Sequence, residues 1–312
     1  MPLRRTIDYV AYFALRVLVC IVQALPLEVC EQLASGLATL FTHVLPARAG
    51  VIAENLRTAF PRITNAEIKK LTWAMWRHLF LMGIEIAHAP RKIHRTNYRQ
   101  YMRIPEIEQV VRIMLAGRPV VVISGHYGNF EMGGYLLGLL GFPTHSVARR
   151  LDNPYLDRFV NDFRRRTGQH ILNKTGSGDQ IERLLNSGGT LALLGDQHAG
   201  DKGCWVKFFG RPASTHKAVA LFSLSFQAPT MVSYVRRRGG VFQYDLRCDD
   251  AIDPRDPSFQ QGTVPLLSEW YTRCLERIIV AAPEQYWWVH RRWKGEPPKR
   301  KVKSRIPISD AA

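Results

Sequence analysis

The apolar positions of the first hundred residues recur with the spacing of α-helices. We predict one helix over 27–44 and another over 49–60, each ending before a proline. Thr64 opens the sequence T-N-A-E, a capping box that predicts the start of a longer helix with apolar positions continuing to Ile84. The N-terminal third of the chain is therefore expected to be helical.

A nearly continuous apolar run, Tyr9–Leu25, precedes these helices and is interrupted only by Arg16 and Gln23. As a helix it would be roughly 25 Å long, slightly less than the hydrocarbon core of about 30 Å. Arg16 lies near its middle, where a charge costs about 2.5–3.5 kcal/mol in a bilayer. We predict a membrane anchor, either a tilted span or an in-plane helix. The alternative is a buried core helix with Arg16 on a solvated face.

The pattern changes after Pro119, where short apolar, β-branched runs alternate with helical stretches. The predicted strands are 120–123, 144–148, 190–194, 230–235 and 241–246. This alternation predicts an α/β fold, with a central, mostly parallel sheet flanked by helices. We expect a membrane-anchor helix at 1–26, a single α/β domain with a helical N-terminal part at 27–293, and a basic, flexible tail at 294–312.

Charge is the unusual feature of the composition. The 312 residues include 43 Lys+Arg against 26 Asp+Glu, which gives a net charge of +17, while 46% hydrophobic residues exclude a disordered chain. Such an excess predicts negatively charged partners: nucleic acid, anionic lipid headgroups or an acidic carrier protein. The five cysteines form no C-x-x-C pair, so the sequence favours reduced thiols over a disulfide framework or a zinc ribbon.

The segment 124–131, S-G-H-Y-G-N-F-E, carries the most informative chemistry. It follows the first predicted strand, at the edge where α/β proteins place their ligands. If His126 lies on the turn and Glu131 in the first turns of the next helix, the two side chains can meet, and Gly125 and Gly128 permit the tight backbone. A carboxylate beside an imidazole fixes its tautomer and stabilises the imidazolium, so we expect His126 to act as a general base oriented by Glu131.

Other catalytic patterns are missing from the sequence. It contains no G-x-S-x-G, no H-E-x-x-H and no G-x-x-x-x-G-K-[ST]. Local spacing also assembles no metal-binding cluster, so we expect no metal.

Five motifs resemble, in order, those of the late acyltransferases of bacterial lipid A biosynthesis, within the lysophospholipid acyltransferase superfamily. The first, 126–131, resembles the signature H-x-G-N-[WF]-E of that family. The others are R-R-L-D-N-P-Y-L-D at 149–157, R-T-G at 166–168, G-D-Q at 195–197 with F-F-G-R-P-A at 208–213, and P-E-Q-Y-W-W-V-H-R-R-W-K at 283–294.

The resemblance implies acyl transfer from a fatty acyl thioester to a hydroxyl of a lipid A precursor or related membrane glycolipid. The donor would be acyl carrier protein or a CoA thioester, a co-substrate, so no cofactor is expected. His126 would deprotonate the hydroxyl without a covalent acyl-enzyme. The candidates for substrate binding or for the oxyanion are Asn129, Arg149, Arg166, Asp196 and Gln197, together with backbone amides near Gly128.

The resemblance also implies where the protein acts in the cell, and other functions remain open beside it. A cytosolic donor implies a catalytic domain on the cytoplasmic side of the inner membrane, with an anionic glycolipid as partner and no nucleic acid. The open alternatives are a phosphatidylinositol-mannoside or lysophospholipid acyltransferase and, in another class, a non-enzymatic basic protein that binds nucleic acid or membranes. The F-P-E-G-T-R block usual in lysophosphatidate acyltransferases does not occur.

Overall fold

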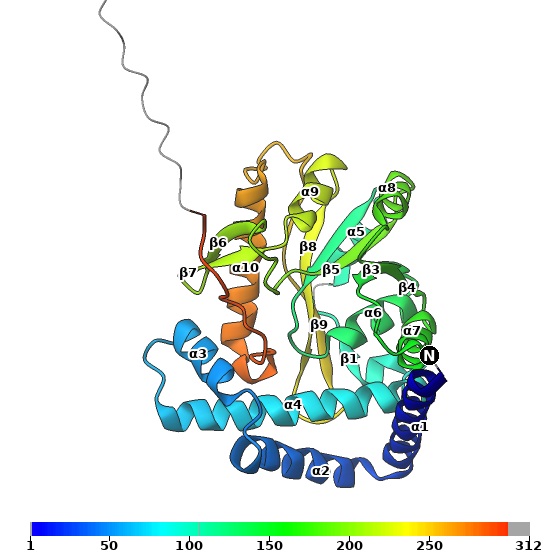
Figure 1. Ribbon diagram of the computed structural model, residues 1–312. Coiled ribbons are helices and arrows are strands. Elements are labelled where there is room, and N and C mark those ends of the chain that lie inside the picture. Colours follow the sequence, from blue (N-terminus) through cyan, green and yellow to red (C-terminus); the bar gives the residue numbers. More distant parts are fainter. Residues whose placement is uncertain (1, 106, 299–312) are drawn as a thin grey trace, which may run out of the picture.

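The computed structural model describes residues 2–105 and 107–298 (Figure 1). The helical N-terminal part comprises α1 (Pro2–Ala24), α2 (Leu27–Thr39), the π-helical turn η1 (Leu40–Val44), α3 (Ala49–Ala59), α4 (Asn65–Lys92) and the 3-10 turn η2 (Tyr98–Gln100). The predicted helices 27–44 and 49–60 are confirmed, the first as α2 continued by η1. The predicted capping box is also present, because Thr64 Oγ1 accepts from Glu67 N and Glu67 Oε2 accepts from Thr64 N.

The rest of the described chain alternates strands and helices. In order, it comprises β1 (Met102–Arg103), α5 (Ile107–Met114), β2 (Val120–Ser124), α6 (Phe130–Leu139), β3 (Thr144–Ala148), α7 (Pro154–Arg165), β4 (Gln169–Asn173), α8 (Gly178–Asn186), β5 (Thr190–Leu194), β6 (Cys204–Phe208), β7 (Arg211–Thr215), α9 (Ala218–Ser225), β8 (Thr230–Arg237), β9 (Tyr244–Ile252), α10 (Val264–Ala281) and the 3-10 turn η3 (Pro283–Gln285).

A seven-stranded sheet in the order β1-β9-β8-β2-β5-β3-β4 forms the centre of the molecule. Strands β8, β2, β5, β3 and β4 run parallel, whereas β9 is antiparallel to β8. The predicted α/β fold with a mostly parallel central sheet is therefore confirmed. The expected strand at 241–246 has the wrong bounds, since residues 241–243 form a turn before β9. Strands β1, β4, β6 and β7 were not predicted.

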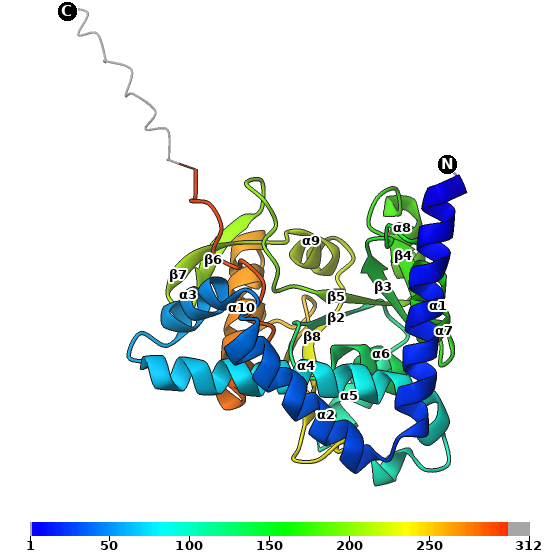
Figure 2. The ribbon, with the colours of Figure 1, turned by 60° about the horizontal axis from the view of Figure 1, so that its bottom comes forward.

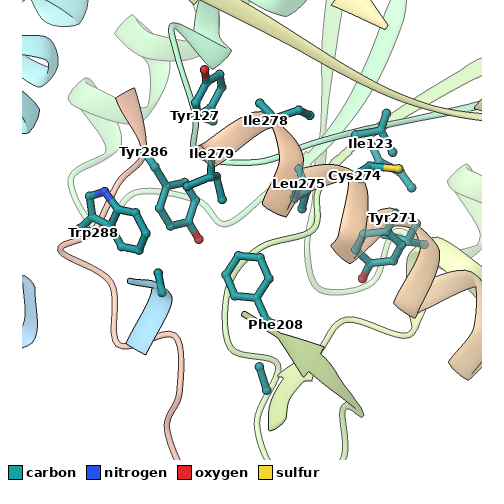
Figure 3. Close-up of a cluster of buried hydrophobic side chains, with 14 of the residues drawn as sticks. Ile123, Tyr127, Phe208, Tyr271, Cys274, Leu275, Ile278, Ile279, Tyr286 and Trp288 are labelled. Carbon is teal, nitrogen blue, oxygen red and sulfur yellow. The ribbon is translucent and has the colours of Figure 1, made fainter. Parts of the chain in front are cut away.

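Helices cover both faces of the sheet. On one face, α5 and α6 pack on apolar side chains of β2, β8 and β9. On the other, α9 and α10 bury the opposite side chains of β2 and β8, and α8 packs on β5. The largest apolar cluster joins Ile123 of β2 to Tyr271 and Leu275 of α10 and continues to Tyr286 and Trp288 near the C-terminus (Figure 3). The C-terminal segment is thereby fixed beside the carboxyl end of β2.

Helix α1 lies along the outside of the molecule, against α7 (Figure 2). The ring centroids of Tyr9 and Tyr155 are 5.4 Å apart, and the Arg16 guanidinium lies 5.4 Å from the centroid of Phe159. Arg16 also donates to Tyr12 Oη at 2.9 Å, so the charge at the middle of the apolar run is stabilised by contacts with aromatic side chains.

The outer face of α1 is apolar and exposed. It carries Ile7, Val10, Phe13, Val17, Leu18 and Ile21. Within the described residues, Arg4–Ala24 is long and apolar enough to cross a bilayer, and none of its most apolar stretch is buried in the protein. The alternative of a buried core helix is therefore wrong. Most of the expected flexible tail, 299–312, lies outside the described residues.

Candidate active site

His126 and Asp196 meet because their strands are neighbours in the sheet. Strands β2 and β5 are parallel and in register, with Ser124 opposite Leu194. Each functional residue follows two positions after the end of its strand, so both reach the same carboxyl edge. There His126 Nδ1 lies 2.8 Å from Asp196 Oδ1, and the backbone N–H of His126 donates to Asp196 Oδ2 at 2.7 Å.

These contacts define the tautomer of His126. Burial raises the pKa of the Asp196 carboxyl, but attraction to the His126 ring, which acts when that ring is protonated, and the hydrogen bonds from His126 outweigh burial, so this pKa is lowered. An ionised carboxylate only accepts hydrogen bonds, so Nδ1 of His126 carries a proton. The Gln197 amide nitrogen lies 3.1 Å from Nε2 and donates to it. The ring is thus held with Nε2 ready to accept a proton.

The predicted pairing of His126 with Glu131 is corrected by the structure. Glu131 instead forms an ion pair with Arg164 of α7, whose Nε donates to Oε2 at 2.9 Å and whose Nη2 donates to Oε1. The physical reason is that Glu131 lies in the first turn of α6, on the side facing α7, while Asp196 occupies the acceptor position at Nδ1 of His126.

Aromatic rings confine the imidazole of His126. The rings of Phe130 and Trp287 each have their centroids 5.0 Å from that of His126, and the backbone N–H of Trp287 donates to the carbonyl oxygen of His126. Only 12% of the His126 side chain is exposed. The C-terminal motif 283–294 therefore forms one wall of the site.

The turn 125–129 is fixed from three directions. The backbone N–H of Gly128 donates to Gln285 O, and that of Asn129 donates to Val235 O of β8. At Gly128, where φ is +58°, an added Cβ would lie 1.9 Å from Val235 O, so only glycine fits. The N–H groups of Gly128 and Asn129 are therefore not available to an oxyanion, because they already have acceptors.

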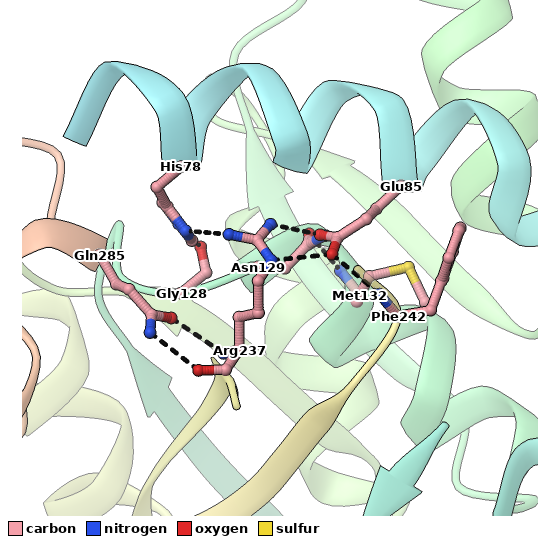
Figure 4. A network of polar contacts seen from close by, with 8 residues as sticks. All are labelled: His78, Glu85, Gly128, Asn129, Met132, Arg237, Phe242 and Gln285. Carbon is pink, nitrogen blue, oxygen red and sulfur yellow. Dashed lines mark hydrogen bonds and ion pairs between the residues drawn. The ribbon is translucent and has the colours of Figure 1, made fainter. Parts of the chain in front are cut away.

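Helix α4 supplies the third direction through a buried polar network (Figure 4). Glu85 is fully buried and forms a bidentate ion pair with Arg237 of β8, at 2.9 and 2.6 Å. Glu85 Oε2 also accepts from Asn129 Nδ2, and His78 Nε2 donates to Gly128 O. Arg237 donates to the other ring nitrogen of His78. Burial and then the charge of Arg237 lower the pKa of His78 to about 3, so its ring is neutral.

The other predicted site residues take different places. Asn129 is buried, caps the N-terminus of α6 and is held by Glu85, so it faces the protein and not a substrate. Arg149 is exposed, pairs with Asp152, and lines a separate basic hollow. Arg166 is exposed at the end of α7. Of the predicted set, Asp196 and Gln197 are the two that contact His126.

An apolar cavity of about 120 Å³ lies between α6 and the sheet, beside His126. Ser124, Leu194 and Ala148 line it at the carboxyl edge, and Phe130, which packs on His126, also borders it. The Glu131–Arg164 pair lines it too, while Val122 and Leu246 line it within the sheet. This arrangement provides a proton acceptor next to an apolar cavity. Among the described residues, no cluster of His, Cys, Asp and Glu is suited to a metal ion.

Sequence reasoning missed several residues that shape this site: His78, Glu85, Arg237 and Trp287. Asp196 was selected only through the family motif. Its position after a predicted strand was a usable signal, since the carboxyl ends of parallel strands share an edge. The arginine that pairs with Glu131 gave no such signal, because a surface-like R-R-R run at 164–166 does not reveal which side chain turns inward.

Comparison with known proteins now identifies the family. The model of the bacterial lipid A biosynthesis acyltransferase family matches residues 2–295. The chain belongs to this family. It is 23% identical to the lipid A biosynthesis lauroyltransferase of Escherichia coli K12, over 93% of this chain and 92% of the relative. It is 25% identical to the palmitoleoyltransferase of the same strain, with the same coverage.

The family assignment makes the chain an enzyme, an O-acyltransferase. The non-enzymatic alternative is therefore wrong. Among solved structures, the 1-acyl-sn-glycerophosphate acyltransferase PlsC of Thermotoga maritima matches over 83% of this chain and 97% of its own, with 12% identity. The TM-score is 0.37, a likeness too low to carry an argument.

Proposed function

We propose that this acyltransferase moves a fatty acyl chain from an acyl thioester to a hydroxyl of a lipid A precursor or a related anionic membrane glycolipid. The observation that carries the proposal is the hydrogen bonding of His126, whose Nδ1–H is donated to Asp196 and whose Nε2 accepts from Gln197, next to Phe130, which lines an apolar cavity. The relatives named above, a lauroyl- and a palmitoleoyltransferase of lipid A biosynthesis, support this acceptor class.

In the proposed reaction, Nε2 of His126 takes the proton of the acceptor hydroxyl as its oxygen attacks the thioester carbonyl. Asp196 stabilises the imidazolium that forms and keeps the ring oriented. The tetrahedral intermediate collapses, the carbon–sulfur bond breaks, and the thiolate leaving group takes the proton back from Nε2. Acyl transfer is thus complete without an acyl-enzyme and without a cofactor.

Gln197 has a place in both halves of this reaction. Its amide occupies Nε2 in the structure, so the acceptor hydroxyl must displace it. The displaced Gln197 amide remains within the site and donates to the oxyanion of the tetrahedral intermediate. Arg149 and Arg166 are less suited to this role, because both are exposed and Arg149 forms an ion pair with Asp152.

The cavity between α6 and the sheet is proposed to hold the acyl chain. Its lining is mostly apolar, and it reaches the carboxyl edge of the sheet, where Ser124 and Leu194 line it. The exposed apolar face of α1 is proposed to enter the inner membrane and to hold the site next to its lipid acceptor, with the catalytic domain on the cytoplasmic side.

The direct test mixes the purified full-length protein with an acyl donor and an acceptor and measures the lipid products by mass spectrometry. Donors are acyl carrier protein and CoA thioesters, and acceptors are a lipid A precursor, a lysophospholipid and a phosphatidylinositol mannoside. We expect a mass gain of one acyl group on the lipid A precursor, with acyl carrier protein as the better donor. His126→Ala should abolish the gain while keeping the wild-type melting temperature. Acylation at the parent rate by this variant would disprove the mechanism.

A further inference from the structure

A second hollow, of about 160 Å³, lies at the same carboxyl edge of the sheet as the active site. It is bordered by the ends of β3 and β4, the loop after β3, and α7. Its lining residues are Ala148, Arg149, Arg150, Asp157, Asn161, Arg165, Ile171 and Asn173. We call it the basic hollow. None of the steps proposed above uses it.

The lining of the basic hollow combines three arginines with one carboxylate. The carboxylate, Asp157, already accepts from the backbone N–H of Leu151 and from Asn161 Nδ2. Arg149 and Arg165 each pair with an exposed aspartate outside the hollow, Asp152 and Asp162 respectively. For Arg150, the described part of the chain offers no ion pair. Like charges repel, so a hollow that gathers three arginines from two segments suits an anion that brings them together.

The geometry favours a phosphate group over other anions. Arginine presents a planar fork of N–H donors that matches the oxygens of phosphate, and the amide of Asn173 adds a neutral donor at the end of β4. The hollow is concave and small, so it accommodates one compact group. The acidic surface of a folded partner is a poorer match, because its carboxylates are spread over a wide area.

The basic hollow and the acyl cavity adjoin, since Ala148 and Ile171 line both. Ala148 is the last residue of β3, so the shared wall reaches the carboxyl edge of the sheet. From β2 to β3 and β4 there are two and three strand steps, which places the hollow roughly 10–15 Å from the end of β2. This distance is short enough for one molecule to place a phosphate in the hollow and another of its groups at His126.

The hollow also lies near the proposed membrane side. Helix α7, which supplies Asp157, Asn161 and Arg165, packs its aromatic face on α1, and Asn153 Nδ2 donates to the backbone carbonyl of Asp8. A lipid headgroup at the surface of the bilayer is therefore within reach of the hollow.

We infer that the basic hollow is a phosphate-binding subsite of this acyltransferase, holding a phosphate group carried by one of the two reactants. The inference rests on the proposed function in one respect, namely that the phosphate belongs to a reactant. Two reactants qualify: a phosphorylated glycolipid acceptor, and a donor whose pantetheine arm contains a phosphodiester.

The first experiment needs no acyl transfer. Inorganic phosphate is titrated into the full-length protein at constant ionic strength, and the melting temperature is followed. We expect a saturable rise for the wild type and for Arg112→Gln, a matched exposed arginine on α5. Arg150→Gln should weaken phosphate binding about ten- to hundredfold, as expected for loss of a hydrogen bond to a charged group. An equal rise in all three proteins overturns the inference.

The second experiment identifies the reactant by steady-state kinetics of Arg150→Gln and Arg165→Gln against Arg112→Gln. If the acceptor carries the phosphate, KM rises about tenfold or more for the phosphorylated glycolipid and is unchanged for its dephosphorylated form. If the donor carries it, KM rises for acyl carrier protein and is unchanged for a short acyl thioester that lacks phosphate.

Two further outcomes keep the inference separate from its rival and from the proposed function. If Arg150→Gln weakened binding of the acyl carrier protein equally with and without its pantetheine arm, the hollow would be a protein-docking surface, and the inference would be overturned. Phosphate binding that depends on Arg150, in a protein without acyl transfer to any acceptor tested, would refute the proposed function and support the subsite.

Discussion

Replacing Asp196 with Asn tests which carboxylate orients the catalytic histidine. The substitution keeps the shape of the side chain but removes the charge that faces Nδ1 of His126 at 2.8 Å. With the two charge centres about 4 Å apart, and an effective dielectric constant near 20, the attraction lost from the imidazolium state is about 4 kcal/mol. That energy corresponds to roughly a thousandfold. We therefore expect kcat to fall about a thousandfold, with a much smaller change in KM.

The measurement is the initial rate of acyl transfer to the lipid acceptor, across a range of donor and acceptor concentrations. Asp253→Asn is the control, because Asp253 is also a hydrogen-bonded carboxylate, accepting from Arg118 and from the backbone N–H of Arg255, but lies at the opposite end of the sheet. It should leave kcat within about twofold. A loss below tenfold for Asp196→Asn, in a protein that melts like the wild type, would refute the assignment of Asp196 and return Glu131 to consideration.

Three further predictions concern the cavity, the pH dependence of stability and the catalytic turn. Gly133→Leu should favour acyl donors shorter by about two methylenes, each worth about 0.8 kcal/mol of burial, because an added Cβ meets only a Val235 methyl at 3.7 Å and the rest of the side chain projects into the cavity. Competition between donors of different chain length, followed by mass spectrometry, measures this preference. The control Gly83→Ala, on an exposed face of α4, should not change it. In the folded protein the pKa of His78 is about 3, compared with an ordinary value of 6.5, because burial and then the charge of Arg237 lower it. Below pH 6.5 the unfolded chain therefore binds a proton at His78 that the folded chain does not, and the free energy of unfolding should fall by about 1.4 kcal/mol per pH unit from about pH 6 towards pH 3. Urea unfolding should show that slope in the wild type and a shallower one in His78→Asn. Gly128→Ala should destabilise the fold by at least about 3 kcal/mol, because its Cβ would overlap Val235 O; a melting temperature equal to that of the wild type would contradict the account of this turn.

The fold was predictable where burial left a strong mark on the sequence. Strand β2 is buried on both faces and is nearly all valine and isoleucine, and β3 and β5 coincide with their predicted ranges. Strand β4, Q-H-I-L-N, lies at the edge of the sheet and needs no continuous apolar run, so it gave no such pattern. The hairpin of β6 and β7 is likewise mixed in polarity and separate from the main sheet.

The sequence allowed the catalytic base, His126, to be predicted, but not the carboxylate that orients it. Sequence proximity favoured Glu131 as the acid beside His126, since it lies only five positions further along the chain. The actual partner, Asp196, is seventy residues away and is brought close only because β5 lies next to β2. Strand order depends on how all helices pack on the sheet, and no local pattern encodes it. The same holds for Arg164, which turns inward from a basic run and neutralises Glu131.

The turn that carries His126 explains why the C-terminal motif belongs to the active site. A base in general acid–base catalysis must keep its position within a fraction of an ångström. Here the carbonyl oxygen of His126 accepts from Trp287, the N–H of Gly128 donates to Gln285, and the next residue is held by Glu85. Since Gln285 and Trp287 come from 283–294, and Glu85 from α4, the turn is fixed by the C-terminal motif and by the longest of the described helices. Sequence motifs far apart along the chain therefore support a single histidine, and loss of either end should reduce kcat before it unfolds the sheet.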